Sequence, residues 1–318
     1  MQRFFIFLLT LALLVYGTDF VLTSVFDAMY QRTWLGQSGG EINQYLALKP
    51  APLVLLMGNS RARYQVNPDS FAIAMHSLCH AGMDQCFQTG LLQVLELEHK
   101  LPEVVLLHVD LSEYAQKESL EDMGTLRYYY NKIPIVTEDI NQISRYERVK
   151  YLFRFYRYNG RIVSQLKNFV QSRNGVPVSN GYQPLEPFPF DTTTMTANRD
   201  TTPVSRHHFQ YTNLGHLLKF VDICQRNHVK LLCFTSPYFN PPSYSAVVAP
   251  VIDSVLQSHG IPYLNCLARA LPVLKHHAHA WHDNDHLNRI GAGYFSHQVA
   301  QWSKPYVLVT DTLRKRAH

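Results

Sequence analysis

The chain has 318 residues, of which 46% are hydrophobic and 17% are charged, with a formal net charge of +5. This length suits one large domain or two ordinary ones, and the composition is that of a globular core rather than a disordered chain. The mildly basic balance permits anionic partners, but no block of Lys and Arg is dense enough to indicate nucleic acid, so we expect none.

The N-terminal residues 1–30 are almost wholly apolar from Phe4 to Phe26. As a helix this stretch would be about 34 Å long, enough to cross the hydrocarbon core of a bilayer. Asp19 opposes insertion, but it lies well past the midpoint, where a carboxylate costs less. Two interpretations remain open: a retained membrane anchor, or a signal peptide that is cleaved near Gly17. Both predict that the rest of the chain is exported.

The five cysteines form no C-x-x-C pair, and an odd number cannot be fully bridged within one chain. We therefore expect buried free thiols rather than a disulfide framework. The cysteines are Cys79, Cys86, Cys224, Cys233 and Cys266.

Residues 31–50 contain three glycines and few apolar runs, so they are predicted to be a linker to a domain at 51–305. Strands and helices alternate from that point. The predicted elements are a strand at Leu53–Met57, a helix from Asn67 through Met75, a short second strand around His76–His80, a helix at Asp84–Lys100 and a strand at Val104–Val109.

The alternation resumes after residue 208 and ends in a predicted basic tail at 306–318. Tight connections between alternating elements favour a parallel sheet covered on both faces. The predicted fold is therefore an α/β, three-layer αβα sandwich with a five-stranded, mostly parallel sheet. Its later elements are a helix at Asn213–His228, a strand at Val229–Thr235, a helix at Ser243–His259, a strand at Ile261–Leu264 and a helix at Arg289–Trp302.

The segment from about 115 to 208 interrupts this alternation and is predicted to be an inserted cap with helical parts that could cover the site. Aromatic residues and arginines are interleaved at 127–130 and 154–161. Such a mixture suits sugar rings or acidic polymers through stacking and charge. The alternative is that the aromatic rings pack the insertion onto the sheet while the arginines face water.

Chemically competent residues follow three predicted strands. Ser60 follows the first strand, Gly82 the second, and Asp110 ends the third. The carboxyl ends of parallel strands form the rim where ligands bind in such sheets. Near the C-terminus, Asp283-x-x-His286 supplies a base and an orienting carboxylate, which a serine needs to become a nucleophile.

With the strand-Gly58-Asn59-Ser60 turn, Gly82 and Asp283-x-x-His286, the chain resembles the SGNH/GDSL hydrolase superfamily over about Leu53 to Trp302. It looks most like membrane-anchored bacterial members associated with cell-envelope polysaccharides. The resemblance implies a triad in which Ser60 attacks an acyl carbonyl, His286 moves the proton and Asp283 orients His286. It also implies an oxyanion hole formed by the backbone N–H groups of Ser60 and Gly82.

The asparagine that such members place after the third strand is missing. His108-Val109-Asp110-Leu111-Ser112 occupies that position, and an ionised Asp110 would repel a developing oxyanion. Loss of one oxyanion donor typically lowers the rate by about 100- to 1000-fold. Ser112 is a possible substitute donor, and we predict Arg61, Asp110 and Ser112 as possible substrate contacts. For Arg61 the alternative is a surface ion pair.

The expected function is a serine-dependent esterase or acyltransferase acting on acyl groups, favouring O-acetyl, of a cell-envelope or exported polysaccharide. The resemblance implies a bacterial inner-membrane location facing the periplasm or exterior, with possible envelope-assembly partners. The alternative is a non-catalytic SGNH-like assembly or glycan-binding protein. We expect no cofactor. The polar loop that carries the histidines lacks an H-E-x-x-H pattern, so we predict no metal for His276, His277, His279 and His282.

Overall fold

The computed structural model describes residues 1–318 except 116–119, 176–178, 188–208, 268–273, 275–276 and 318. The chain forms two compact units. The smaller unit combines Met1–Ala47 with Leu120–Val178, and the larger combines Leu48–Ser119 with Ser179–His318. Only part of the predicted insertion at 115–208 therefore belongs to the smaller unit, together with the N-terminal helix. Its role as a cap stays a prediction, and residues 188–208 lie outside the described part.

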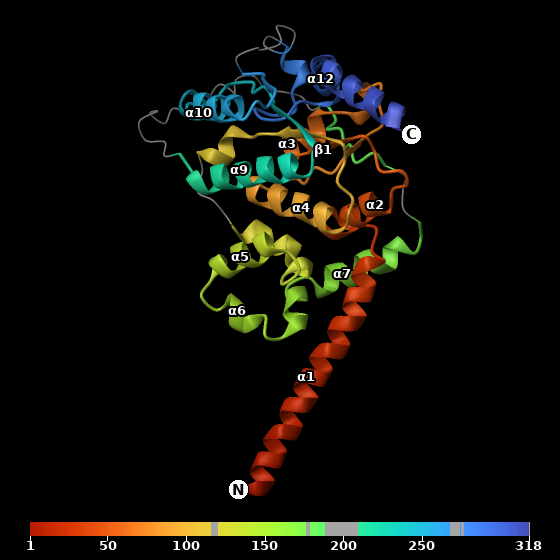
Figure 1. Ribbon diagram of the computed structural model, residues 1–318, viewed down its shortest axis with the longest axis vertical. Helices are drawn as coiled ribbons and strands as arrows, with labels where there is room; N and C mark the ends of the chain where they lie inside the picture. Colours follow the sequence, from red (N-terminus) through yellow and green to blue (C-terminus); the bar gives the residue numbers. More distant parts are fainter. Residues whose placement is uncertain (116–119, 176–178, 188–208, 268–273, 275–276, 318) are drawn as a thin grey trace. The chain divides into compact units, whose positions relative to one another are not determined.

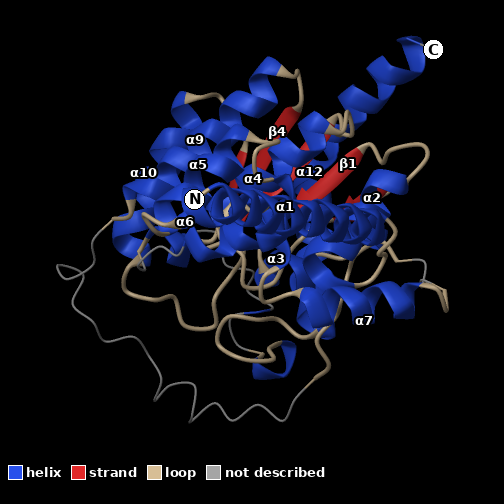
Figure 2. Cartoon of the chain, turned by 90° about the horizontal axis from the view of Figure 1, so that it is seen from below, coloured by secondary structure: helices blue, strands red, loops and turns tan. Residues whose placement is uncertain are grey.

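The larger unit contains a five-stranded sheet in which every pairing is parallel, in the order β2-β1-β3-β4-β5. This confirms the predicted α/β fold and sharpens it from mostly to entirely parallel. The strands lie among the helices of the unit (Figures 1 and 2). They are β1 Val54–Met57, β2 Met75–Ser77, β3 Val104–His108, β4 Lys230–Thr235 and β5 Tyr263–Asn265.

Both faces of the sheet are covered, which explains why its strands are continuous apolar runs. Alternate residues such as Leu56, Leu106 and Phe234 share one core with α3 (Ser60–Gln65) and α12 (Arg289–Ala317). Their neighbours point to the opposite face, because side chains alternate along a strand. On that side, α4 and α9 pack against each other (Figure 1).

Most predicted helices of the larger unit are present within a few residues: α4 Gln85–Leu97, α9 Tyr211–Arg226 and α10 Ser245–Ser258. One prediction was wrong: the helix expected from Asn67 to Met75 is only a 3₁₀ turn at Pro68–Ser70, after which the chain extends into β2. The residues predicted as a basic tail, 306–318, continue α12 as far as Ala317.

The smaller unit is helical and is built on α1 (Gln2–Gln31). The predicted linker at 31–50 instead contains a π-helical turn at Gly36–Gly40 and helix α2 at Glu41–Ala47. The remaining elements of this unit are η4 Leu120–Tyr129, α5 Pro134–Ile143, α6 Glu147–Lys150, η5 Arg154–Tyr158 and α7 Ile162–Ser172.

Aromatic side chains hold this unit together. Tyr30 of α1 stacks on Tyr128 with ring centroids 4.1 Å apart, and Tyr130 stacks on Tyr151 at 3.6 Å. Tyr128, Tyr130 and Tyr151 are all buried. The interleaved aromatic residues thus pack inside the smaller unit. The interpretation that they pack the insertion onto the sheet stays a prediction.

The one helix in the described part of the chain that is long and apolar enough to cross a membrane is α1. Its acidic residue is accommodated: Asp19 accepts hydrogen bonds from the backbone N–H groups of Arg154 and Phe155 at 3.0 and 2.9 Å. The carboxylate thereby satisfies the first N–H groups of η5. From the sequence, Asp19 was expected only to oppose membrane insertion, whereas in the structure its carboxylate binds the start of η5.

Candidate active site

The turn after β1 places Ser60 at the start of α3. Gly58 has φ of +149°, and a Cβ there would lie 2.6 Å from the Cβ of His108. Only glycine fits that conformation and that contact. Asn59 then caps α3, because its Oδ1 accepts the backbone N–H of Arg61 at 3.0 Å. The Gly58-Asn59-Ser60 sequence thus forms a strand-turn-helix with the serine at its exit.

Ser60, His286 and Asp283 form a continuous hydrogen-bonded chain. The Oγ of Ser60 lies 2.9 Å from Nε2 of His286. On the other side of the ring, Nδ1 of His286 lies 3.0 and 2.9 Å from the two carboxylate oxygens of Asp283. Because a carboxylate can only accept, the neutral imidazole carries its proton on Nδ1, which leaves Nε2 free to accept the serine proton.

The loop that carries the acid and base is held from several sides. A bridge between Trp281 and Leu287 closes it, and Asn288 donates from Nδ2 to the carbonyl groups of His279 and Trp281. Gln65 of α3 donates to the carbonyl of Asp285 at 2.8 Å. The helix that begins at the nucleophile therefore also fixes the loop of its base.

Asp283 is ionised at neutral pH. Burial alone would raise the pKa of this carboxyl, but the hydrogen bond from His286, the attraction of its imidazolium form and the backbone N–H groups of Asp285 and His286 lower it below its usual range. About 22% of the His286 side chain is exposed, so substrate can reach the imidazole. The arrangement is that of an acid-base pair activating a serine.

The backbone N–H groups of Ser60 and Gly82 are without hydrogen bonds among the described residues. β1 pairs with β2 as Leu56 with Ser77, and the carbonyl of Gly58 accepts the N–H of His80 at 2.9 Å. Gly82 follows this contact by two residues, in the turn after β2. Gly82 has φ of +76° and faces open space. Its assignment to the oxyanion hole stays a prediction.

Asp110, at the end of β3, is buried and fully bonded. Its Oδ2 accepts from Nδ2 of Asn59 at 2.7 Å. Its Oδ1 accepts from the backbone N–H and the hydroxyl of Ser112 and from the hydroxyl of Tyr238, at 3.0, 2.9 and 3.0 Å. Burial would raise the pKa of Asp110, but the charge of Arg61 and the surrounding donors hold it well below its usual range. The hydroxyl proton of Ser112 is thus already engaged.

Arg61 is also buried, and its guanidinium contacts protein on several sides. Nη2 donates to the carbonyl groups of Ser236 and Pro237 at 2.9 and 2.7 Å. Nη1 lies 3.5 Å from Asp110, and Cζ lies 3.6 Å from the ring centre of Tyr238. The surface ion pair considered for Arg61 was wrong. Burial leaves neither Arg61 nor Asp110 a surface for substrate in this structure.

A second carboxyl adjoins Asp110. Nδ2 of Asn59 donates both to Asp110 and to Oε1 of Glu113, the latter at 2.9 Å. Burial, followed by repulsion from Asp110 and Asp84, raises the pKa of Glu113 well above its usual range. Nearby His108 is neutral, because burial lowers its pKa to about 3. Asp110 raises this pKa, whereas Arg61 and His286 lower it further. Nothing in the sequence pattern pointed to Asn59, Glu113 or His108 as one network.

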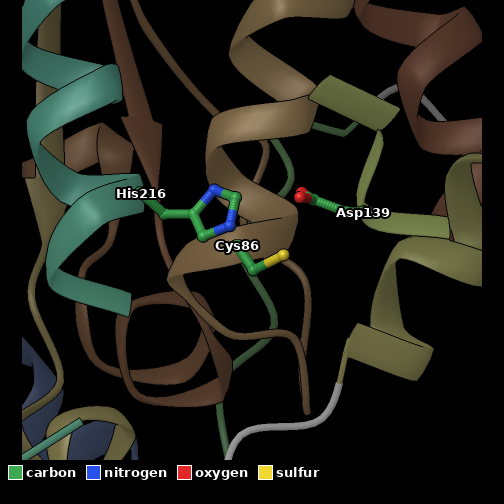
Figure 3. Close-up of side chains that lie close together, drawn as sticks. All are labelled: Cys86, Asp139 and His216. Atoms are coloured by element: carbon green, nitrogen blue, oxygen red, sulfur yellow. The ribbon is translucent and has the colours of Figure 1, made fainter. Parts of the chain in front are cut away.

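Of the histidines at the C-terminal loop, His276 lies outside the described residues. The rings of His277 and His279 have centroids 5.1 Å apart, and Nδ1 of His282 lies 3.1 Å from the carbonyl of Glu186. No described group of three potential metal ligands includes His277, His279 or His282. Elsewhere in this unit, a ligand atom of Cys86 on α4 lies within 4.8 Å of one of His216 on α9 (Figure 3).

All five cysteines are free and buried, as expected. The sequence matches no protein-family model and no curated protein. The resemblance to SGNH hydrolases therefore stays a prediction that depends on the residues themselves.

Proposed function

We propose that this protein is a serine-dependent esterase or acyltransferase that removes or transfers an acyl group through Ser60, His286 and Asp283. The observation that carries the proposal is the unbroken contact from Ser60 Oγ to Nε2 of His286 and from Nδ1 to Asp283, at 2.9 Å in each step. A serine bonded to a histidine that a carboxylate orients is the arrangement that nucleophilic acyl transfer requires.

In the proposed reaction, the Oγ of Ser60 attacks the ester carbonyl carbon while its proton moves to Nε2 of His286. The backbone N–H groups of Ser60 and Gly82 stabilise the oxyanion. The C–O bond to the alcohol then breaks, and the departing oxygen takes the proton from His286, which leaves an acyl-Ser60. Water or a second hydroxyl attacks this ester, passing its proton through His286, and restores the free serine.

The proposed substrate is an O-acyl ester, favouring O-acetyl, on a cell-envelope or exported polysaccharide, because the resemblance points to that class. We further propose that α1 is retained as an anchor and that the larger unit faces the periplasm or the exterior. The bonds that Asp19 makes within the smaller unit support this, since they offset the cost of an acid in an apolar helix. Retention in membranes after an alkaline carbonate wash tests the anchor, and release with a new N-terminus near Thr18 contradicts it.

A non-catalytic role in envelope assembly or glycan binding is the second proposal. One observation favours it: Asp110 lies where the resemblance calls for a neutral side-chain donor, and Ser112 and Asn59 already donate to Asp110. Only backbone donors then remain for an oxyanion.

Labelling of the full-length chain in detergent with a serine-directed fluorophosphonate separates the two proposals. We expect labelling of the parent and of Ser258→Ala, an exposed serine on α10, and none of Ser60→Ala. Labelling that persists in Ser60→Ala contradicts the role of Ser60. Absence of labelling of the parent between pH 5 and 9 supports the non-catalytic role.

A further inference from the structure

The smaller unit contains a cavity of ≈ 240 Å³ that is lined entirely by its own residues. Three arginines line it, Arg127, Arg157 and Arg161, together with Thr33 and Gln165 and the glycine-rich turn at Gly36–Gly40. Its lining residues come from α7, η5, η4, the glycine-rich turn and the C-terminal end of α1, and both α7 and η5 pack against α1. Figure 1 shows α7 beside the C-terminal end of α1. Its size suits a small polar group rather than a large ligand.

The three arginines differ in how their charges are balanced. Arg157 forms an ion pair with Asp27 at 3.3 Å. In the described part of the chain, Arg127 donates to the carbonyl of Asn159 at 3.4 Å, and Arg161 donates to the carbonyl of Thr125 at 3.3 Å. Neither arginine contacts a carboxylate of a described residue. Among the described residues, two positive charges in this cavity therefore lack a counter-charge.

An orphaned donor accompanies these charges. Nε of Arg127 is buried and has no hydrogen-bond acceptor among the described residues. A buried donor without a partner costs about 1–3 kcal/mol, and more when it is charged. Burial, followed by repulsion from Arg127, lowers the pKa of Arg161, which shows that the two guanidinium groups act on each other. An anion between them would remove both costs.

The glycine-rich turn brings backbone close to the same cavity. Gly36 has φ of +96°, and a Cβ there would lie 2.4 Å from Nδ2 of Asn168, another lining residue. A side chain at that position would force Asn168 to move. Close approach of bare backbone beside arginines is a recurrent way of holding phosphate.

The position of the cavity relative to α1 indicates where the anion comes from. Tyr30, which lines the cavity, is four residues past Phe26, or about 6 Å along a helix. The exposed apolar side chains of α1 end at Val25, whereas Phe26 is buried against Phe155 and Tyr158, so a headgroup at the end of the lipid-facing side of α1 would lie close to the cavity. Outside α1, this unit also exposes apolar side chains suited to lipid, at Tyr146, Val149, Leu152, Val163 and Val170.

We infer that this cavity binds a phosphate group through Arg127 and Arg161, and that the headgroup of an anionic phospholipid supplies it. The planar guanidinium presents parallel N–H donors that match two phosphate oxygens, which a lysine ammonium cannot do. The lipid source depends on α1 being retained in the membrane, whereas the site does not depend on the chemistry at Ser60.

The test uses the full-length chain in detergent with two probes: inorganic phosphate by calorimetric titration, and mixed phosphatidylglycerol and phosphatidylcholine by native mass spectrometry. Arg127→Gln/Arg161→Gln is compared with Arg148→Gln/Arg154→Gln, which removes the same charge from exposed positions of the same unit. We expect the first double variant to bind phosphatidylglycerol at least tenfold more weakly than the parent and the control to keep parental binding.

Arg127→Lys/Arg161→Lys keeps both charges without the planar donors, and we expect it to lose most of the binding as well. Thermal unfolding of the ligand-free Gln variant should occur at or above the parental temperature, because two repelling charges are gone, so loss of binding is separable from loss of fold. Binding of inorganic phosphate without phosphatidylglycerol overturns the lipid source. Equal loss of binding in both Gln variants, or no binding of either probe by the parent, overturns the site.

Discussion

Ser60 and Asp110 follow neighbouring strands at the same rim of the sheet, yet their surroundings are opposite. The hydroxyl of Ser60 has one partner, His286, and its backbone N–H has none among the described residues. Asp110 is 3% exposed, and both of its oxygens accept hydrogen bonds. Position on the rim therefore does not identify a reacting group. Unused bonding capacity next to solvent distinguishes Ser60 from a residue that positions others.

Arg61 extends this comparison to charge. Arg61 is buried and has an acid, two carbonyl groups and an aromatic face around its guanidinium. Arg127 is partly buried, and among the described residues its guanidinium has one carbonyl and the ring of Tyr156 but no acid. Both arginines have a buried Nε without a hydrogen bond in the described part of the chain, so the missing acid is what separates them. A buried arginine whose partners come from its own chain supports structure, and one that lacks them is ready for a ligand.

The largest effect should come from the triad. Asp283→Asn keeps the shape of the loop but cannot hold the proton on Nδ1 of His286, so we expect fluorophosphonate labelling to slow by about 10³- to 10⁴-fold. Asp285→Asn is the matched control. Asp285 lies on the same loop, but the carboxylate that contacts the imidazole of His286 belongs to Asp283. Labelling rates over time measure both. Equal rates for Asp283→Asn and the parent would show that Asp283 does not orient the base.

Asp110→Asn tests the other side of the comparison. It leaves Arg61 buried without a counter-charge, and breaking a buried pair in this way costs about 3–5 kcal/mol. Chemical denaturation of the full-length chain measures the loss in free energy of unfolding. Asp222→Asn removes an acid from the exposed pair with Arg226, where about 1 kcal/mol or less is expected. A loss for Asp110→Asn no larger than that of Asp222→Asn would mean that the cluster contributes little to stability.

The sequence predicted what local pattern controls. Apolar runs predicted strands β1, β3 and β4, and helical periodicity predicted α4 and α9, because both signals lie in consecutive residues. The placement of Ser60 at the rim of the sheet followed from these elements. The helix predicted after Asn67 was wrong. Asn67 and Pro68 do start a 3₁₀ turn, but the pairing of β2 with β1 requires an extended chain a few residues later.

The bonds of Asp110 and Arg61 could not be predicted for a different reason. Most of them join residues far apart in the sequence, such as Asp110 with Tyr238 and Arg61 with Ser236, and no local pattern encodes such contacts. The same applies to Asp19 and the start of η5. An acid in an apolar stretch indicates a cost, while the group that offsets the cost becomes visible only in three dimensions.

The effect expected for Glu113 appears only as pH changes, and it sharpens the comparison of the buried acids. Its pKa is raised in the folded chain, mainly by burial and then by Asp110 and Asp84, so the folded state keeps the proton to higher pH than the unfolded state does. Stability should therefore fall as pH rises above about 4.3, the ordinary value of glutamate, until the raised pKa is passed. Glu113→Gln cannot lose that proton and keeps a carbonyl oxygen for Asn59.

We therefore expect the free energy of unfolding of Glu113→Gln to rise relative to the parent between pH 5 and pH 8. The gain should be about 1.4 kcal/mol for every pH unit over which the folded chain still holds the proton and the unfolded chain has lost it. Denaturation curves at four pH values give this slope. If Glu113→Gln shows the parental pH dependence, Glu113 is ionised beside Asp110, and the bridging amide of Asn59 holds two negative charges rather than one.

Glu96→Gln provides a control of opposite sign. The hydrogen bond from Arg226, partly offset by burial, lowers the pKa of Glu96 in the folded chain. This carboxylate therefore stabilises the fold above the ordinary pKa of glutamate, and that contribution is lost as pH falls through the lowered value. Removing the charge should slightly destabilise the chain between pH 5 and pH 8, where Glu113→Gln is stabilised. Two substitutions of the same chemistry thus move stability in opposite directions, because one carboxyl is buried beside an acid and the other is partly buried beside an arginine.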